Sequence, residues 1–139
     1  VKEELYQKAL DFNADVVIIM FGSNDSKNAD WKGEEHFIAE YSALIESFLA
    51  RPSIKKMYIM APPPAWEFFG KVRYNINSDR VKNEINRATR TLADKYDLGF
   101  IDLYEVFDGK RELFADGVHP TDKGAKLLAE TVYSAIRRK

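Results

Sequence analysis

The chain has 139 residues, no cysteine and a formal net charge of −1, which results from 21 basic and 22 acidic side chains. With 45% hydrophobic residues it can bury the core of one globular domain, which we expect to span residues 1–139. The balanced charge argues against a nucleic-acid partner, the lack of a membrane-length apolar segment against a membrane span, and the lack of cysteine against a disulfide framework or a thiol nucleophile.

Helix-like and strand-like segments alternate along the sequence. Residues 2–12 carry apolar side chains on one helical face, and residues 15–21 contain the unbroken apolar run VVIIMF. Such a run is typical of a strand whose two faces are both covered, as in a parallel sheet. In chain order we then expect a helix over 34–50, a strand over 56–61, a helix capped by Ser78, a strand over 98–103 and a helix after Pro120.

Proline and polar residues mark the ends of these segments. The run Pro62-Pro63-Pro64 stops the second strand, because proline cannot donate a hydrogen bond to a sheet. Thr121 is expected to cap the last helix, and Asp102 to cap or turn the chain where the third strand ends. No repeat or flexible linker divides the sequence into two domains.

The alternation predicts an α/β fold, in which a parallel sheet with right-handed crossovers has helices on both faces. Three strands are few for this architecture, since a sheet typically has about five or six. We therefore expect further strands upstream of residue 1. Without them, the strand over 15–21 would expose unpaired backbone groups and apolar side chains along one side.

The first polar motif is Gly22-Ser23-Asn24-Asp25, which directly follows the first strand. Ligands of open α/β sheets bind beyond the carboxyl ends of the strands, so this motif lies where chemistry is expected. The Asn24 amide is a neutral N–H donor that can stabilise a developing oxyanion. The alternative is an ordinary turn, in which Asn24 and Asp25 satisfy nearby backbone groups.

The second motif is Asp116-Gly117-Val118-His119-Pro120, which precedes the last helix. Pro120 disfavours a helical conformation at His119, so the imidazole projects from a loop. Asp116 precedes His119 across a turn that Gly117 allows, and its carboxylate can reach the Nδ1–H of the ring. This pairing suits a general base. The alternative is a loop that only caps the helix.

Together the two motifs resemble the G-x-N-D and D-x-x-H blocks of the SGNH, or GDSL-type, hydrolases. The resemblance covers essentially the whole chain, and within the family it points to carbohydrate-directed acetylesterases such as sialate O-acetylesterase-like proteins. It implies a flavodoxin-like three-layer α/β/α fold. It also implies that Asn24 is an oxyanion-hole donor, His119 the general base and Asp116 its orienting partner, with Gly22 and Asp25 in supporting roles.

The family's nucleophile is a serine in a Gly-Asp-Ser block, and a glycine after the second family strand supplies another oxyanion donor. The chain contains neither block, and none of its serines follows Gly-Asp: Ser23, Ser26, Ser42, Ser47, Ser53, Ser78 and Ser134. We therefore interpret the chain as the carboxyl-terminal portion of an SGNH hydrolase domain whose N-terminal strands are missing. We expect its partner to be the amino-terminal segment of the domain. That segment would be a separate, cleaved chain or would be missing from this sequence.

This interpretation predicts a serine ester hydrolase that acts on acyl esters, and more narrowly on O-acetyl groups of a carbohydrate. It requires no cofactor and no metal, and the chain alone is expected to be inactive. One alternative is a catalytically inactive carbohydrate-binding or scaffold protein of the same fold. A weaker one makes Asp25, Asp116 and His119 ligands of a divalent cation. The aromatic residues after the prolines are candidates for a sugar-binding surface: Trp66, Phe68 and Phe69.

Overall fold

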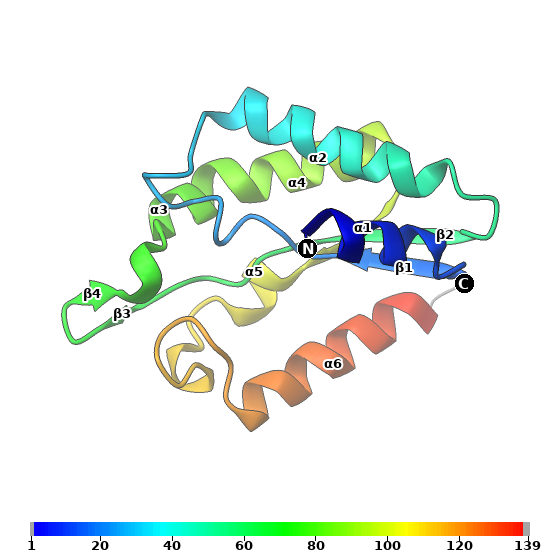
Figure 1. Cartoon of the computed structure of the whole chain (residues 1–139). Helices are drawn as coiled ribbons and strands as arrows, with labels where there is room; N and C mark the ends of the chain where they lie inside the picture. Colours follow the sequence, from blue (N-terminus) through cyan, green and yellow to red (C-terminus); the bar gives the residue numbers. More distant parts are fainter. Residues whose placement is uncertain (1, 138–139) are drawn as a thin grey trace.

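A parallel sheet of three strands forms the centre of the structure, a computed structural model that describes residues 2–137 (Figure 1). β1 (Val16–Ile19), β2 (Lys56–Ala61) and β5 (Gly99–Asp102) lie in the order β1-β2-β5. The predicted α/β class and the parallel sheet are therefore confirmed.

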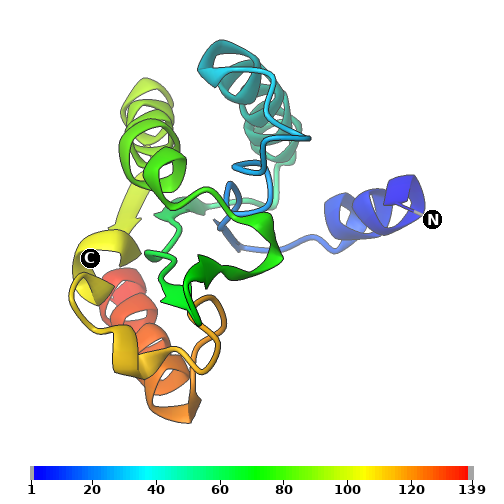
Figure 2. The same ribbon diagram turned by 90° about the vertical axis from the view of Figure 1, so that its left-hand side faces the viewer.

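Helices cover both faces of this sheet (Figure 2). α2 and α4 pack on one face, and α5 and α6 pack on the other. The helices are α1 (Lys2–Asp11), α2 (Glu34–Leu49), α3 (Ser78–Arg80), a π-helical turn η2 (Val81–Ile85), α4 (Asn86–Lys95), α5 (Leu103–Phe107) and α6 (Asp122–Arg137). Smaller elements are the hairpin of β3 (Glu67–Phe68) and β4 (Lys71–Val72) and the 3₁₀ turns η1 (Arg73–Asn75) and η3 (Arg111–Leu113).

Each face of the sheet buries its own apolar cluster. In α2, Phe37, Tyr41 and Ile45 recur every fourth residue, so they lie on one side of the helix and pack against the sheet. On the opposite face, Met60 and Phe107 pack with the apolar side of α6. These two clusters hold the carboxyl ends of β1 and β2 at one edge of the molecule, where the loops that carry polar residues begin.

The predicted caps are confirmed at two of three helices. Thr121 Oγ1 accepts a hydrogen bond from the Gly124 backbone N–H at 3.2 Å, and Asp102 accepts one from the Glu105 N–H at 3.0 Å. The cap assigned to Ser78 is wrong, because Ser78 is already helical. The residue before it, Asn77, has an extended backbone and its side chain accepts from the Arg80 N–H at 2.9 Å.

Other boundaries also differ from the sequence predictions. β1 ends at Ile19, where its pairing with β2 ends, rather than at residue 21. The helix predicted after Ser78 contains a π-helical turn over Val81–Ile85. The β3–β4 hairpin and α5 were not predicted, since strands of 2 residues and a helix of 5 residues are too short to show a hydrophobic period.

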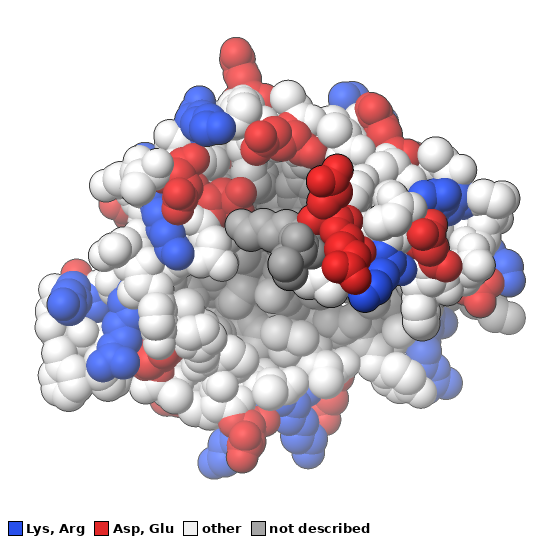
Figure 3. Space-filling view, in the orientation of Figure 1, with Lys and Arg blue, Asp and Glu red and all other residues white. Residues whose placement is uncertain are grey.

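The expectation that both faces of β1 are covered is not met within residues 2–137, where β1 instead exposes apolar side chains, as expected for this strand without further strands upstream. Val16 is 43% exposed and Ile18 is 36% exposed, because α6 packs on β2 and β5 and does not reach them. α1 projects away from the sheet beyond β1 (Figure 2), and its Leu5 is 61% exposed. In Figure 3, the described residues that are visible in the hollowed surface between α1 and α6 include no Lys, Arg, Asp or Glu. Among residues 2–137, β1 is thus an edge strand with an uncovered apolar face.

Across residues 2–137, no helix combines the length and the apolar character needed to cross a lipid bilayer.

Candidate active site

The loop that carries Asp116 and His119 is closed by its own backbone. The Ala115 N–H donates to the His119 carbonyl at 2.9 Å, and the Thr121 N–H donates to the Leu113 carbonyl at 2.8 Å. At its tip, Gly117 has a φ of +86°, and a Cβ there would lie 2.4 Å from the Trp66 carbonyl oxygen. Only glycine fits this turn without displacing the neighbouring chain.

Asp116 and His119 form a hydrogen-bonded pair on this loop. His119 Nδ1 lies 2.9 Å from Asp116 Oδ2, so the neutral ring carries its proton on Nδ1 and leaves Nε2 as the proton acceptor. Asp116 Oδ1 accepts the backbone N–H groups of Val118 and His119 at 2.9 and 2.7 Å. The His119 side chain is 64% exposed and that of Asp116 is 17% exposed. The imidazole is therefore held from one side and open on the other.

Hydrogen bonds keep the Asp116 carboxylate ionised. The largest effect on its pKa is the bond from the His119 ring, followed by the bond from the His119 backbone N–H, and together they hold the pKa well below its usual range. The carboxylate therefore stays negative throughout the neutral pH range. A fixed negative charge next to Nδ1 stabilises the imidazolium that forms when Nε2 takes up a proton.

A second turn places Asn24 just beyond β1. Gly22 has a φ of +123°, and a Cβ on it would lie 2.4 Å from the Ile85 side chain, so a residue without a side chain is required. The Ser26 N–H closes the turn on the Gly22 carbonyl at 2.9 Å. The Ser26 side chain is fully buried, while Asn24 is exposed.

One cavity of about 370 Å³ brings Asn24 and His119 together at the carboxyl edge of the sheet. Apolar side chains, among them Met20, Phe114 and Leu128, complete its walls. The cavity thus has a proton acceptor and an amide donor on its walls, with an apolar lining between polar groups, as small-molecule sites commonly have.

Asp25 lies apart from this cavity. It lines a different one, together with Phe21 and Tyr41, so the structure does not bring it to Asp116 and His119. No cluster of three or more His, Asp or Glu side chains able to hold a metal ion exists among residues 2–137. The cation-site alternative built on Asp25, Asp116 and His119 therefore has no geometric basis in this part of the chain.

The serines near the site are not arranged as nucleophiles. The buried Ser26 hydroxyl donates to the Ser23 carbonyl at 2.7 Å and accepts from the Asn77 N–H at 3.0 Å. Ser23 lies on the wall of the cavity, but among the described residues no serine hydroxyl is hydrogen-bonded to the His119 ring. The activated Ser–His contact of a serine hydrolase is thus not formed among residues 2–137.

The aromatic residues after the prolines belong to the neighbouring hairpin. Trp66 packs on the buried Phe114 with ring centroids 4.7 Å apart, so it supports the wall behind the cavity. Phe69, at the hairpin tip, is 91% exposed, and Phe68 packs beside it. Trp66 therefore has a packing role, and the sugar-binding surface proposed from the sequence stays a prediction for Phe68 and Phe69.

Tyr74 is a site residue that the sequence did not indicate. It lines the same cavity as Asn24 and His119, and its hydroxyl donates to Asp116 Oδ2 at 2.9 Å. It lies in a short irregular segment after β4, where no periodic pattern or known motif marks it.

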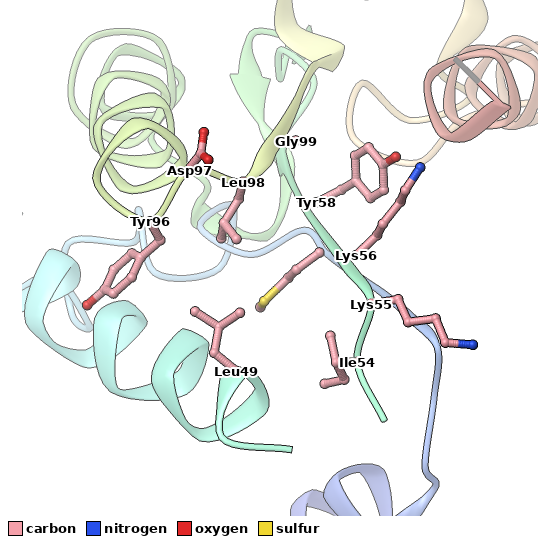
Figure 4. A pocket seen from close by; sticks show the side chains of 10 residues that line it. Leu49, Ile54, Lys55, Lys56, Tyr58, Tyr96, Asp97, Leu98 and Gly99 are labelled. Atoms are coloured by element: carbon pink, nitrogen blue, oxygen red, sulfur yellow. The ribbon is translucent and has the colours of Figure 1, made fainter. Parts of the chain in front are cut away.

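A second cavity of about 370 Å³ lies at the opposite edge of the sheet (Figure 4). Leu49, Ile54 and Leu98 lie around it, and the Lys55 ammonium group points away. It opens at the amino ends of β2 and β5, whereas ligand sites of open α/β sheets lie at the carboxyl ends. Its lining contains no histidine, so it lacks the proton acceptor of the Asn24–His119 cavity.

Comparisons with known sequences find relatives of this chain. A model of the GDSL-like lipase/acylhydrolase family matches residues 2–127. An acetylxylan esterase of Xylanibacter ruminicola is 32% identical over 97% of this chain. The chain spans only 31% of the length of that relative.

Solved structures show the same fold. The lipase/acylhydrolase from Enterococcus faecalis superposes with a TM-score of 0.81 at 25% identity, over 97% of this chain and 67% of that one. The acetyl xylan esterase AlAXEase superposes with a TM-score of 0.76 at 27% identity, over 96% of this chain and 75% of that one.

Proposed function

Because this chain belongs to the GDSL-like lipase/acylhydrolase family, we propose that it carries the general base and oxyanion donor of a serine ester hydrolase that removes acetyl groups from a carbohydrate. The observation that carries this proposal is the Asp116–His119 pair, which shares a cavity with Asn24 at the carboxyl edge of the sheet. Family membership supports the reaction class, and the geometry of the pair and the cavity supports the proposed roles.

In the proposed reaction, a serine Oγ attacks the acetyl carbonyl carbon while His119 Nε2 takes its proton. The Asp116 carboxylate stabilises the resulting imidazolium, and the Asn24 amide donates a hydrogen bond to the oxyanion. The sugar oxygen leaves with the proton from His119, and an acetyl-enzyme remains. A water molecule, deprotonated by His119, then attacks this ester, releases acetate and restores the serine hydroxyl.

We further propose that the serine comes from another segment that pairs with β1. The support is the uncovered apolar face of β1 around Val16 and Ile18, at a strand with no neighbour on its outer side among residues 2–137. A strand added there would end at the same edge of the sheet as Asn24 and could place a serine near His119. The assembly of this chain with the serine-bearing segment is called the complemented protein below.

The removal of the Asn24 amide tests its assignment. In the complemented protein, Asn24→Ala is expected to lower kcat for p-nitrophenyl acetate by about 10² to 10³, because one donor to the oxyanion is lost. KM should change much less, since the oxyanion forms only after substrate binds. Asn83→Ala is a matched control, because Asn83 is also exposed and lies on η2 outside the cavity lining. A change in KM alone would make Asn24 a binding residue and contradict the oxyanion role.

The proposed substrate class is tested by acyl length and by a natural glycan. The two relatives named as acetylxylan esterases support a small acyl group. In the complemented protein, kcat/KM is expected to fall by about tenfold or more from p-nitrophenyl acetate to the octanoate, as in an enzyme that selects acetyl groups. Acetylated xylo-oligosaccharides should release acetate, measured by NMR. A preference for octanoate would indicate a lipase and contradict the proposal.

A further inference from the structure

Tyr74 contacts both members of the Asp116–His119 pair from a separate part of the fold. Its hydroxyl donates to Asp116 Oδ2 at 2.9 Å. Its ring packs edge-on against the His119 imidazole, with ring centroids 5.0 Å apart and planes at 78°. Tyr74 therefore touches the carboxylate and the ring that this carboxylate orients.

The Tyr74 hydroxyl completes the hydrogen bonds of Asp116. Oδ1 accepts the N–H groups of Val118 and His119, while Oδ2 accepts His119 Nδ1 and the Tyr74 hydroxyl. A carboxylate offers about four acceptor positions, so the set is full. Three of these donors belong to the same short loop as Asp116. Tyr74 alone, among the described donors, ties the carboxylate to another element.

The backbone at Tyr74 is strained in the way that functional sites often are. Tyr74 has φ 59° and ψ 20°, and Asn75 has φ 57°, so two consecutive residues with side chains adopt the left-handed conformation. With this backbone conformation, Tyr74 lines the cavity, and Ile76, which follows Asn75, is buried.

The segment that follows Tyr74 is fixed to the loop that carries Asn24. The Asn77 N–H donates to the Ser26 hydroxyl at 3.0 Å, and the Arg80 guanidinium donates to the Ser26 carbonyl. Since Ser26 lies within two residues of Asn24, the segment from Tyr74 to Arg80 connects the Asp116 side of the cavity with the Asn24 side. A rigid anchor of this kind can hold a side chain in one orientation.

We propose that Tyr74 is a positioning residue, which holds the Asp116 carboxylate and thereby keeps the His119 ring oriented for proton transfer. This inference rests on the proposed esterase function. Without the Tyr74 hydroxyl, the carboxylate can rotate and the imidazole samples orientations in which Nε2 does not face the substrate. The loss affects the chemical step rather than substrate binding.

The test compares Tyr74→Phe, which removes only the hydroxyl, with Tyr133→Phe in the complemented protein. Tyr133 is a matched control, since it is 56% exposed, against 51% for Tyr74, and lies on α6 outside the cavity lining. We expect Tyr74→Phe to lower kcat for p-nitrophenyl acetate by about tenfold with KM within about twofold. Tyr133→Phe should change neither. An unchanged kcat in Tyr74→Phe overturns the proposal.

Two further measurements separate positioning from general damage. In an Asp116→Asn background, Tyr74→Phe should lower kcat by less than about twofold, because its effect passes through the carboxylate. A full additional tenfold loss would show that Tyr74 acts independently and would overturn the inference. Ring ¹⁵N chemical shifts should show the Nδ1–H tautomer of His119 in the parent protein and a mixture of tautomers in Tyr74→Phe. If the complemented protein has no esterase activity, the proposed function fails, and the tautomer shifts still decide the role of Tyr74.

Discussion

Replacing His119 with alanine is expected to lower kcat/KM of the complemented protein for p-nitrophenyl acetate by about 10⁴ to 10⁶. His119 is the group that takes the serine proton in the proposed reaction. In the structure its Nδ1 is hydrogen-bonded to Asp116, which leaves Nε2 as the proton acceptor. Asp116 remains in place in this variant, but a carboxylate that faces Nδ1 cannot replace the missing Nε2.

The fold should tolerate this change. The His119 side chain is 64% exposed, and the loop is closed by backbone groups rather than by the ring. Thermal unfolding should therefore occur within a few degrees of the parent protein. His36→Ala is the matched control, because His36 lies on α2 and faces Glu40 at 3.1 Å, away from the site. Activity of His119→Ala within about threefold of the parent would refute the general-base assignment.

The second large effect concerns the chain by itself. Residues 1–139, expressed alone, are expected to show no ester hydrolysis above the uncatalysed rate, and to gain activity when mixed with the serine-bearing segment. A base, its partner carboxylate and an oxyanion donor can polarise a carbonyl, but no acyl-enzyme forms without an activated hydroxyl. The edge of β1 gives the added segment a place to pair.

The experiment uses two versions of the segment. One carries the Gly-Asp-Ser serine and the other carries alanine in its place; both should co-elute with the chain on size exclusion, and only the first should restore hydrolysis of p-nitrophenyl acetate. A fluorophosphonate probe should label the serine of the added segment. Labelling of Ser23 or Ser26 in the chain alone, together with hydrolysis, would place the nucleophile inside this sequence and contradict the proposal.

Much of the architecture could be predicted because its signals are local. Apolar periods marked the main strands and helices, and the D-x-x-H spacing led to the Asp116–His119 pair within one loop. The shared edge of a parallel sheet was enough to predict that Asn24 would approach His119, and both line one cavity. Their catalytic roles, and the extent of the domain, remain predictions.

The features that escaped prediction depend on distant contacts or on very short elements. Tyr74 meets Asp116 across 42 positions of sequence and from a backbone conformation that is rare for tyrosine, so neither pattern nor propensity indicates it. Asn and Ser are both good helix caps, so the sequence does not distinguish Asn77 from Ser78. In the structure Asn77 is the cap, and its backbone N–H is also held by the Ser26 hydroxyl. The open face of β1, in contrast, was expected for a strand without further strands upstream, and the exposure of Val16 and Ile18 agrees with that expectation.

The closed base of the loop that carries Asp116 and His119 bears on the order in which the proposed active site is assembled. Its closing contacts, from Leu113 to Thr121 and from Ala115 to His119, are all made within a few residues of each other. The loop that carries Asp116 and His119 can therefore close by local contacts alone, before more distant parts of the fold are in place. In the proposed reaction, an associating segment would then need to bring only the nucleophile to a loop that is already closed.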